Sequence, residues 1–199
     1  MKNEVTQPVR GRPMDPKVHK AILSAAMKLL ETQCVGELTI KGIADAAGVT
    51  RPAIYRRWST PTEIALDAFL ETAEREIPFQ EGDDPVEALT AHILAMTRFM
   101  RSQRGRVVTE LLGAAQSDPE LLALFRERFL EQRRKLGRVL FQDGIDREVF
   151  DTGLDIDLAI DLYAGPIYHR ALAGHETLTD AFAERLADYV LRAIGASLS

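Results

Sequence analysis

The chain has 199 residues and a formal net charge of −5 at pH 7. This length allows a buried core, either in one compact domain or in a small domain joined to a larger one. The charge is unevenly distributed: residues 1–60 hold ten Lys and Arg against five Asp and Glu, which makes them +5 and leaves −10 for residues 61–199. A basic module before an acidic body argues against a general polyanion binder and favours a protein that contacts DNA with one part only.

Cysteine usage and hydropathy restrict the compartment. Cys34 is the only cysteine, so no intrachain disulfide can form, and a reducing compartment is favoured. A redox switch would need an acidic, exposed thiol, and nearby Lys41 does not make an electropositive site, so a structural role for Cys34 is preferred. No run is apolar enough to span a bilayer, and the polar start of the chain lacks the apolar core of a signal peptide. We therefore expect a cytoplasmic protein that makes no membrane contact.

Residues 1–15 are expected to form a flexible basic arm. The arm contains the sequence RGRP, with Arg10 and Arg12, which resembles the core of minor-groove hooks in which arginine enters a narrow A·T-rich groove. A disordered arm that does not bind DNA is an equal alternative. From Val18 to Leu30 the apolar residues then follow a helical stripe, and this helix would cover the next two from behind.

Residues 39–58, TIKGIADAAGVTRPAIYRRW, predict two short helices joined by a glycine turn. Gly48 supplies the left-handed residue that ends the first helix at little cost. Thr50 is placed to cap the second helix, Pro52 lies in its first turn, and Val49 with Ile54 can form a hydrophobic staple. This pattern is typical of a helix-turn-helix, so double-stranded DNA is the leading partner. We place a helix-turn-helix domain at 16–59 and a helical regulatory and dimerisation domain at 60–199.

The rest of the chain predicts helices only. Ser59 or Thr60 can cap a helix that begins at Pro61, and Ser117-Asp118-Pro119-Glu120 is read as a capping box that begins a long helix with Leu136 on its apolar stripe. A loop is expected at 143–153. Helices are expected from about 61 to 78, 84 to 100, 107 to 115, 118 to 141, 155 to 173 and 177 to 196. Because strand-like alternation is nowhere sustained, the predicted fold is all-α with about nine helices.

The segment from residue 17 to residue 70 resembles the TetR family of transcriptional regulators. The resemblance is carried by Thr39-Ile40, Ile43-Ala44, Ala47-Gly48-Val49-Thr50 and Ile54-Tyr55-Arg56-Arg57-Trp58, where turn, cap, aromatic residue and spacing coincide. It implies an N-terminal three-helix DNA-binding domain and a C-terminal helical body that dimerises and holds a small-molecule pocket. The stretch LYAGPIYHRALAGHETLTDAF at 162–182 also resembles one subgroup of such bodies.

The resemblance assigns DNA contacts to individual residues. It implies phosphate contacts for Thr39, Thr50, Tyr55 and Arg57, base-edge contacts for Arg51, Pro52 and Ala53, and either role for Arg56. Physical chemistry agrees in outline, because groups near a helix start bind phosphate and arginine reads the O6 and N7 atoms of guanine. This chain has Pro61 where many relatives have a lysine that faces a phosphate, so one expected anchor is missing.

A second set of residues is expected to line a ligand pocket. Its members are methionines, aromatic residues and a few polar tips on inward-facing stripes, a composition that suits a mainly apolar organic molecule of unknown identity. They are Met96, Phe99, Met100, Leu112, Gln116, Phe125, Phe129, Tyr163, Tyr168 and His169. The alternative interpretation is that most of them are ordinary core residues.

No sequence motif indicates catalysis. There is no nucleophile elbow, phosphate loop or zinc motif, and His92, His169 and His175 lack the close spacing of metal ligands, so no catalytic residue, cofactor or metal is expected. We expect a ligand-responsive regulator, most simply a repressor, that binds a palindromic operator as a homodimer and is released by its effector. An activator would share the architecture. The alternatives are a small helical enzyme with an incidental helix-turn-helix-like hairpin and a DNA-binding protein that ignores ligands.

The two last helices of each copy are expected to form the dimer seam as a four-helix bundle. Its candidate apolar contacts are Ala159, Leu162, Ile167, Ala171, Leu172, Phe182, Leu186, Tyr189, Val190 and Ile194.

Overall fold

The structure, a computed structural model, describes residues 15–76 and 84–196, and within these ranges the chain forms helices and turns without a strand. They comprise α1 (Pro16–Leu30), α2 (Ile40–Ala47), α3 (Arg51–Tyr55), α4 (Pro61–Glu76), α5 (Pro85–Arg101), α6 (Gln103–Ala115), α7 (Pro119–Phe125), α8 (Glu131–Asp146), α9 (Ile156–Ala173) and α10 (Asp180–Ala193), with a 3₁₀ turn η1 (Val35–Glu37) and a π turn η2 (Arg126–Leu130). Helices α7 and α8 join through η2 without a break, so residues 15–76 and 84–196 contain nine separate helices. The predicted all-α fold is confirmed.

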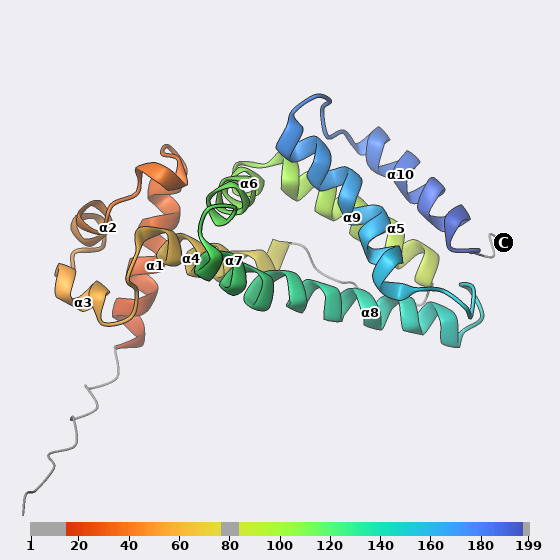
Figure 1. Cartoon of the computed structure of the whole chain (residues 1–199), viewed down its shortest axis with the longest axis horizontal. Helices are drawn as coiled ribbons and strands as arrows, with labels where there is room; N and C mark the ends of the chain where they lie inside the picture. Colours follow the sequence, from red (N-terminus) through yellow and green to blue (C-terminus); the bar gives the residue numbers. More distant parts are fainter. Residues whose placement is uncertain (1–14, 77–83, 197–199) are drawn as a thin grey trace, which may run out of the picture.

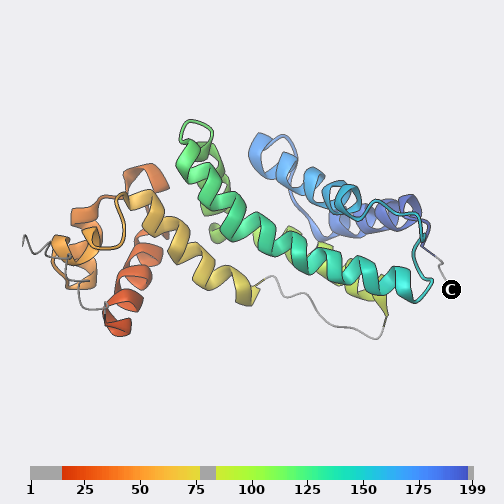
Figure 2. The same ribbon diagram turned by 60° about the horizontal axis from the view of Figure 1, so that its bottom comes forward.

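The molecule is elongated, with the helix-turn-helix at one end. Figure 1 shows α1, α2 and α3 grouped together, and α5, α9 and α10 gathered at the opposite end. Helix α4 runs from the first group toward the body and packs against α1 on one side and α6 and α7 on the other. In Figure 2 the continuous rod of α7, η2 and α8 passes along the body to the far end, and its first part, α7, contacts α4.

Helix starts follow the sequence closely because short polar side chains cap them. The Thr60 hydroxyl accepts a hydrogen bond from the Glu63 N–H at 3.2 Å, so Thr60 caps α4 at its predicted start. The Glu63 carboxylate accepts a second hydrogen bond from the Ser59 N–H at 2.9 Å. At α7 the expectation was one residue early. The cap is Asp118, whose carboxylate accepts from two backbone N–H groups, and Ser117 lies outside the helix.

The loop expected at 143–153 was wrong in its first four residues, because α8 continues to Asp146. Gly144 lies inside the helix, and the reason for glycine there is packing. A Cβ at that position would lie 2.2 Å from a ring carbon of Phe150. The chain leaves the helix only afterwards, where the Val149 and Phe150 N–H groups both donate to the Gly144 carbonyl.

The π turn explains a second error. An unbroken α-helical stripe through Phe125 and Phe129 places Leu136 inward, whereas Leu136 is 44% exposed. In η2 the Glu131 N–H donates to the Arg126 carbonyl, so the turn contains one additional residue. The buried face beyond it therefore shifts by one position, to Gly137 and Phe141.

Among the helices of residues 15–76 and 84–196, none is long and apolar enough to cross a bilayer.

Candidate DNA-reading surface and ligand cavity

The turn between α2 and α3 has the geometry that its sequence predicts. Thr39 caps α2 by accepting from the Gly42 N–H at 3.0 Å, and Gly48 ends the helix with φ of 65°. Thr50 occupies the N-cap position of α3, but its side chain makes no capping hydrogen bond. Its hydroxyl is therefore available to another acceptor such as a phosphate oxygen.

Helix α3 buries one face and exposes the other. Ile54 is completely buried, while Tyr55 is 58% exposed. The residues assigned to DNA from the sequence lie on the open side or at the helix start: Thr39, Thr50, Arg51, Pro52, Arg56 and Arg57 are exposed, and Ala53 is half-buried. Among the residues that the structure describes, Arg51, Arg56 and Arg57 form no ion pair, so no carboxylate neutralises this surface. Arg10 and Arg12 lie outside the described residues.

Trp58 follows α3 and fixes the end of the helix-turn-helix. Its indole is buried. The His19 ring stacks on it with centroids 5.2 Å apart, and the Arg57 guanidinium lies over the ring, 5.5 Å from its centre. Desolvation, followed by the positive charge of Arg57, lowers the pKa of His19 below its ordinary value. The indole N–H donates to a carboxylate oxygen of Asp67 in α4 at 2.8 Å.

Asp67 also connects α4 to the π turn. This carboxylate is only 8% exposed, and its second oxygen accepts a hydrogen bond from the guanidinium of Arg128 in η2. Two residues further along α4, the Phe69 ring meets the Phe129 ring edge-on with centroids 4.9 Å apart. The π turn is thus fastened to α4 by a charged contact and an aromatic contact on adjacent residues.

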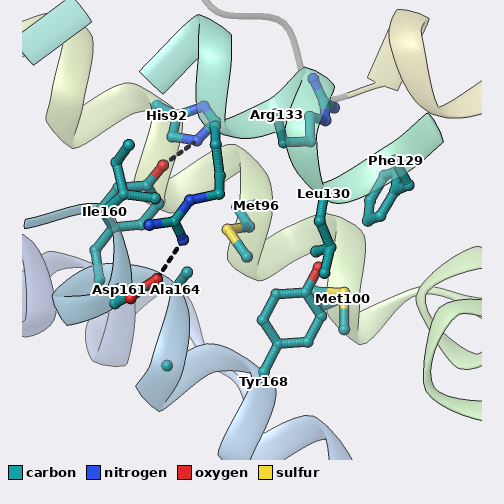
Figure 3. Close-up of a pocket in the computed structure, with 13 residues that line it drawn as sticks. His92, Met96, Met100, Phe129, Leu130, Arg133, Ile160, Asp161, Ala164 and Tyr168 are labelled. Atoms are coloured by element: carbon teal, nitrogen blue, oxygen red, sulfur yellow. Dashed lines mark hydrogen bonds and ion pairs between the residues drawn. The ribbon is translucent and has the colours of Figure 1, made fainter. Parts of the chain in front are cut away.

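A cavity of about 300 Å³ lies between α5, α9 and the beginning of α8. It is lined by His92, Met96, Met100, Phe129, Leu130, Arg133, Arg134, Ile160, Asp161, Tyr163, Ala164, Gly165 and Tyr168. Figure 3 shows Met96, Met100, Leu130 and Tyr168 around its apolar part. The volume is at the lower end of the range for ligand pockets and suits a small molecule.

Half of the sequence candidates meet in this cavity. Met96, Met100, Phe129, Tyr163 and Tyr168 line it. The other five lie elsewhere: Phe99 and Phe125 are in the core, Leu112 is half-buried on α6, Gln116 is exposed and donates to the Leu112 carbonyl, and His169 is exposed on α9.

The sequence interpretation missed eight lining residues. Ile160 and Ala164 could have been found, because they share an i, i+4, i+8 stripe with Tyr168. Leu130, Arg133 and Arg134 follow the π turn, which no periodicity in the sequence indicated. The remaining three are His92, Asp161 and Gly165.

Charged groups occupy one side of the cavity. Arg134 donates to the Asp161 carboxylate at 2.5 Å and to that of Asp157 at 3.1 Å, and Figure 3 marks the contact with Asp161. Hydrogen bonds from Arg138, and then from Arg134, hold the pKa of Asp157 below its ordinary value. These acids, read from the sequence as a solvated helix face, are exposed but form an ion-pair network with α8.

The outer face of α9 carries an exposed stripe. Leu158, Leu162, Gly165, His169 and Leu172 are all exposed, and their spacing of four, three, four and three residues is that of a coiled-coil seam. Of the ten residues expected in the dimer seam, Leu162, Leu172 and Tyr189 are exposed and Ala171 is half-buried. The other six were wrong, because they pack into the protomer's own core: Ala159, Ile167, Phe182, Leu186, Val190 and Ile194.

The histidines do not form a metal centre in the part of the chain that the structure describes, where no group of three or more potential ligands comes together. His169 and His175 are neighbours, with ring centroids 4.7 Å apart. His92 lies apart from them, in the cavity.

Two family models match the chain. The one described as "Bacterial regulatory proteins, tetR family" matches residues 22–68. The one described as "Tetracyclin repressor-like, C-terminal domain" matches residues 80–190, more than half of the chain. The chain belongs to the TetR family. The helix-turn-helix predicted from the sequence is thereby confirmed.

Relatives in the TetR family agree over nearly the full length. The chain is 37% identical over 180 residues to the uncharacterised HTH-type transcriptional regulator YdeS of Bacillus subtilis, covering 90% of this chain and 91% of that one. It is similar to the crystal structure of the TetR-family regulator SCO0332, with 29% identity and a TM-score of 0.78 over 92% of this chain and 100% of that one. FadR from Bacillus subtilis, solved with stearoyl-CoA, shares the fold with 21% identity and a TM-score of 0.69 over 86% and 97%.

Proposed function

We propose that this protein is a ligand-responsive transcriptional repressor. Two copies bind a palindromic operator through α3, and a small, mainly apolar molecule in the cavity releases them. The observation that carries the proposal is the position of η2. Its consecutive residues contact both the end of the helix-turn-helix and the cavity. Arg128 contacts the Asp67 carboxylate that holds Trp58, and Phe129 and Leu130 line the cavity.

The proposed DNA contacts divide by chemistry. Arg51 reads a base edge, with Pro52 and Ala53 making apolar contacts nearby, because the start of a recognition helix enters the major groove. Thr39, Thr50, Tyr55 and Arg57 bind phosphates, and Arg56 takes either role. Arg10 and Arg12 would enter the adjacent minor groove. The exposure of the α3 side chains supports this division, as does the lack of an ion pair to these arginines among the described residues.

The second copy is proposed to cover the exposed stripe of α9. Leucines at coiled-coil spacing lose their contact with water in such a seam. Tyr189 of α10 is also exposed and is proposed to join it. A twofold axis there would place two α3 helices on one side of the dimer. Two major-groove half-sites about 34 to 36 Å apart would then be read together.

Ligand control requires that a filled cavity moves α4. A molecule that displaces Phe129 acts directly on Phe69, and one that shifts Leu130 or Phe129 also shifts Arg128 of the same turn. Such motions change the contact at Asp67 and hence the position of Trp58 at the end of the helix-turn-helix. FadR from Bacillus subtilis, which shares this fold, was solved in complex with stearoyl-CoA, a ligand with a long apolar part.

The experiment that tests this proposal fills the cavity with a covalently attached group, so the natural ligand need not be known. The variant Cys34→Ser/Ala164→Cys offers one thiol in the cavity wall, which benzyl methanethiosulfonate converts to a benzyl disulfide and dithiothreitol regenerates. Operator duplexes are first selected from random DNA, and affinity is measured by filter binding. We expect modification to lower operator affinity about 5- to 150-fold, the range of allosteric coupling, and reduction to restore it.

Two controls locate the effect. Cys34→Ser/Ala123→Cys carries the same benzyl group on an exposed position of α7 and should bind DNA normally. Adding Arg128→Gln to the cavity variant should abolish most of the response, whereas Arg126→Gln, on the same turn, should preserve it. Unchanged DNA binding after complete modification of the thiol in the cavity wall would indicate a DNA-binding protein that ignores ligands. Failure to select any duplex would reopen the enzyme alternative.

A further inference from the structure

Two tyrosines, Tyr163 and Tyr168, line the cavity, and their hydroxyl groups differ in their hydrogen-bond partners. The Tyr163 hydroxyl lies 3.3 Å from Nε2 of His92, within hydrogen-bonding distance. Within the described part of the chain, the Tyr168 hydroxyl has no hydrogen-bond partner. Figure 3 shows it directed toward Leu130 and Met100. The cavity therefore contains a polar tip that its own walls do not satisfy.

The surroundings of Tyr168 make this hydroxyl a hydrogen-bond donor. The neighbouring cavity walls are Met96, Met100 and Leu130, none of which is a strong acceptor. Desolvation by burial raises the pKa of Tyr168 to about 12, so the phenol keeps its proton at neutral pH. A ligand that displaces water from such a group loses affinity unless it accepts the hydrogen bond itself.

Two arginines, Arg133 and Arg134, also line the cavity. The Arg134 guanidinium already donates to Asp161 and Asp157. The positive charge of Arg133 opposes part of the rise in the pKa of Tyr168 that burial causes. Because the phenol itself is neutral, a ligand group that meets Tyr168 needs a lone pair of electrons but no negative charge.

We infer that the effector is a compact, mainly apolar molecule with a neutral hydrogen-bond acceptor, such as a ketone or ester carbonyl, and that Tyr168 selects it by donating to that oxygen. This inference rests on the proposed function, since it names the class of molecule that occupies the proposed effector site. Tyr168 is then the residue that distinguishes a carbonyl compound from a hydrocarbon of the same shape.

The test compares pairs of probes that differ only at the acceptor. Acetophenone is paired with α-methylstyrene, and 2-acetylnaphthalene with 2-isopropenylnaphthalene, since a cavity of about 300 Å³ suits one or two rings. Dissociation constants are measured by calorimetry for the full chain, for Tyr168→Phe and for Tyr189→Phe, a matched change on an exposed tyrosine. We expect each ketone to bind roughly 3- to 10-fold tighter than its alkene, as for one neutral hydrogen bond. Tyr168→Phe should abolish this preference and Tyr189→Phe should retain it.

Three results with the ketone and alkene probes would overturn the inference. They are equal binding of ketone and alkene to the unmodified protein, a ketone preference that survives in Tyr168→Phe, and binding of neither probe of either pair. A tighter complex with 2-naphthoate than with 2-acetylnaphthalene would replace the neutral class with an anionic one. The proposed function is judged separately, because the benzyl disulfide experiment needs no hydrogen bond at Tyr168 and can succeed when this one fails.

Discussion

At the scale of single residues, one buried carboxylate, that of Asp67, connects two parts of the molecule through two hydrogen-bond donors. Asp67 accepts from the Trp58 indole and from the Arg128 guanidinium, and it is nearly inaccessible to water. Arg128 itself is partly solvated, which weakens the ion pair compared with a fully buried one. The indole hydrogen bond is enclosed, so its loss leaves a buried donor unsatisfied.

Asp67→Val should therefore destabilise the fold measurably. We expect the free energy of unfolding to fall by about 1 to 3 kcal/mol, the cost of a buried donor without a partner. Asp67→Asn keeps an acceptor for Trp58 and should lose less. Urea denaturation measures both, with Glu71→Gln on the same helix as control. Equal losses for the Val and Asn variants would show that the ion pair, and not the indole contact, dominates.

His19 should make stability depend on pH. Burial and Arg57 lower the pKa of His19 in the folded protein, while Asp67 and Glu71 oppose them, and the unfolded chain takes up its proton near 6.5. Below that pH the unfolded state binds more protons, so the free energy of unfolding falls as pH decreases. His19→Phe keeps a ring against Trp58 but cannot titrate. Its melting temperature should fall less than that of the unmodified protein between pH 7 and pH 5, and parallel curves would contradict the assignment.

At the scale of elements, α3 is a short helix held from behind. Five residues do not form a stable helix alone, and its position comes from the Gly48 turn, the buried Ile54 and Trp58 beyond its end. The exposed side chains can therefore be changed without disturbing the core. Their contributions to DNA binding separate into those that depend on sequence and those that do not.

Arg51→Ala should relax base preference, whereas Arg57→Ala should weaken binding to all duplexes about equally. A bidentate arginine contact to guanine distinguishes bases by about 1 to 3 kcal/mol, while a phosphate contact carries no sequence information directly. Footprinting and competition with substituted operators measure the difference, and Tyr55→Phe is expected to behave like Arg57→Ala. Unchanged sequence preference in Arg51→Ala would contradict the base-reading role.

The elements also show where sequence reasoning succeeds. Caps such as Thr39, Thr60 and Asp155 act within a few residues, so the helix starts could be predicted locally. The π turn could not be predicted, because a one-residue insertion into a helix has no periodic pattern. For this reason the sequence placed Leu136 inward and did not indicate Leu130, Arg133 and Arg134 as cavity residues. The Asp and Gly content of residues 143–153 predicts a loop, whereas the small size of Gly144 serves a tertiary contact with Phe150 inside α8.

At the scale of the whole molecule, apolar residues of α9 and α10 divide between two surfaces. Sequence periodicity identifies both as apolar but cannot tell which packs within one copy and which remains exposed. The structure makes this choice, since Ile167 and Leu186 enter the protomer's core while Leu162 and Leu172 remain outside. The same reason explains why Phe99 and Phe125, expected in the pocket, lie in the core and not in the cavity wall.

Leu162→Glu should separate the proposed dimer. A charge in the middle of the α9 stripe has no partner there, and its burial in the seam would cost several kcal/mol. Sedimentation equilibrium should show a dimer for the unmodified chain and a monomer for the variant. Leu136→Glu, on the exposed side of α8, is the control and should remain dimeric. A monomeric unmodified protein at micromolar concentration would contradict the two-copy mechanism.

The joint between the two halves of the molecule also contains its only tryptophan. Indole emission responds to local polarity and to nearby charges, so Trp58 is a built-in optical reporter at the place where ligand and DNA would communicate. No dye or engineered label is required. Stopped-flow mixing could therefore follow the rearrangement in real time and reveal whether it precedes or follows dissociation from the operator.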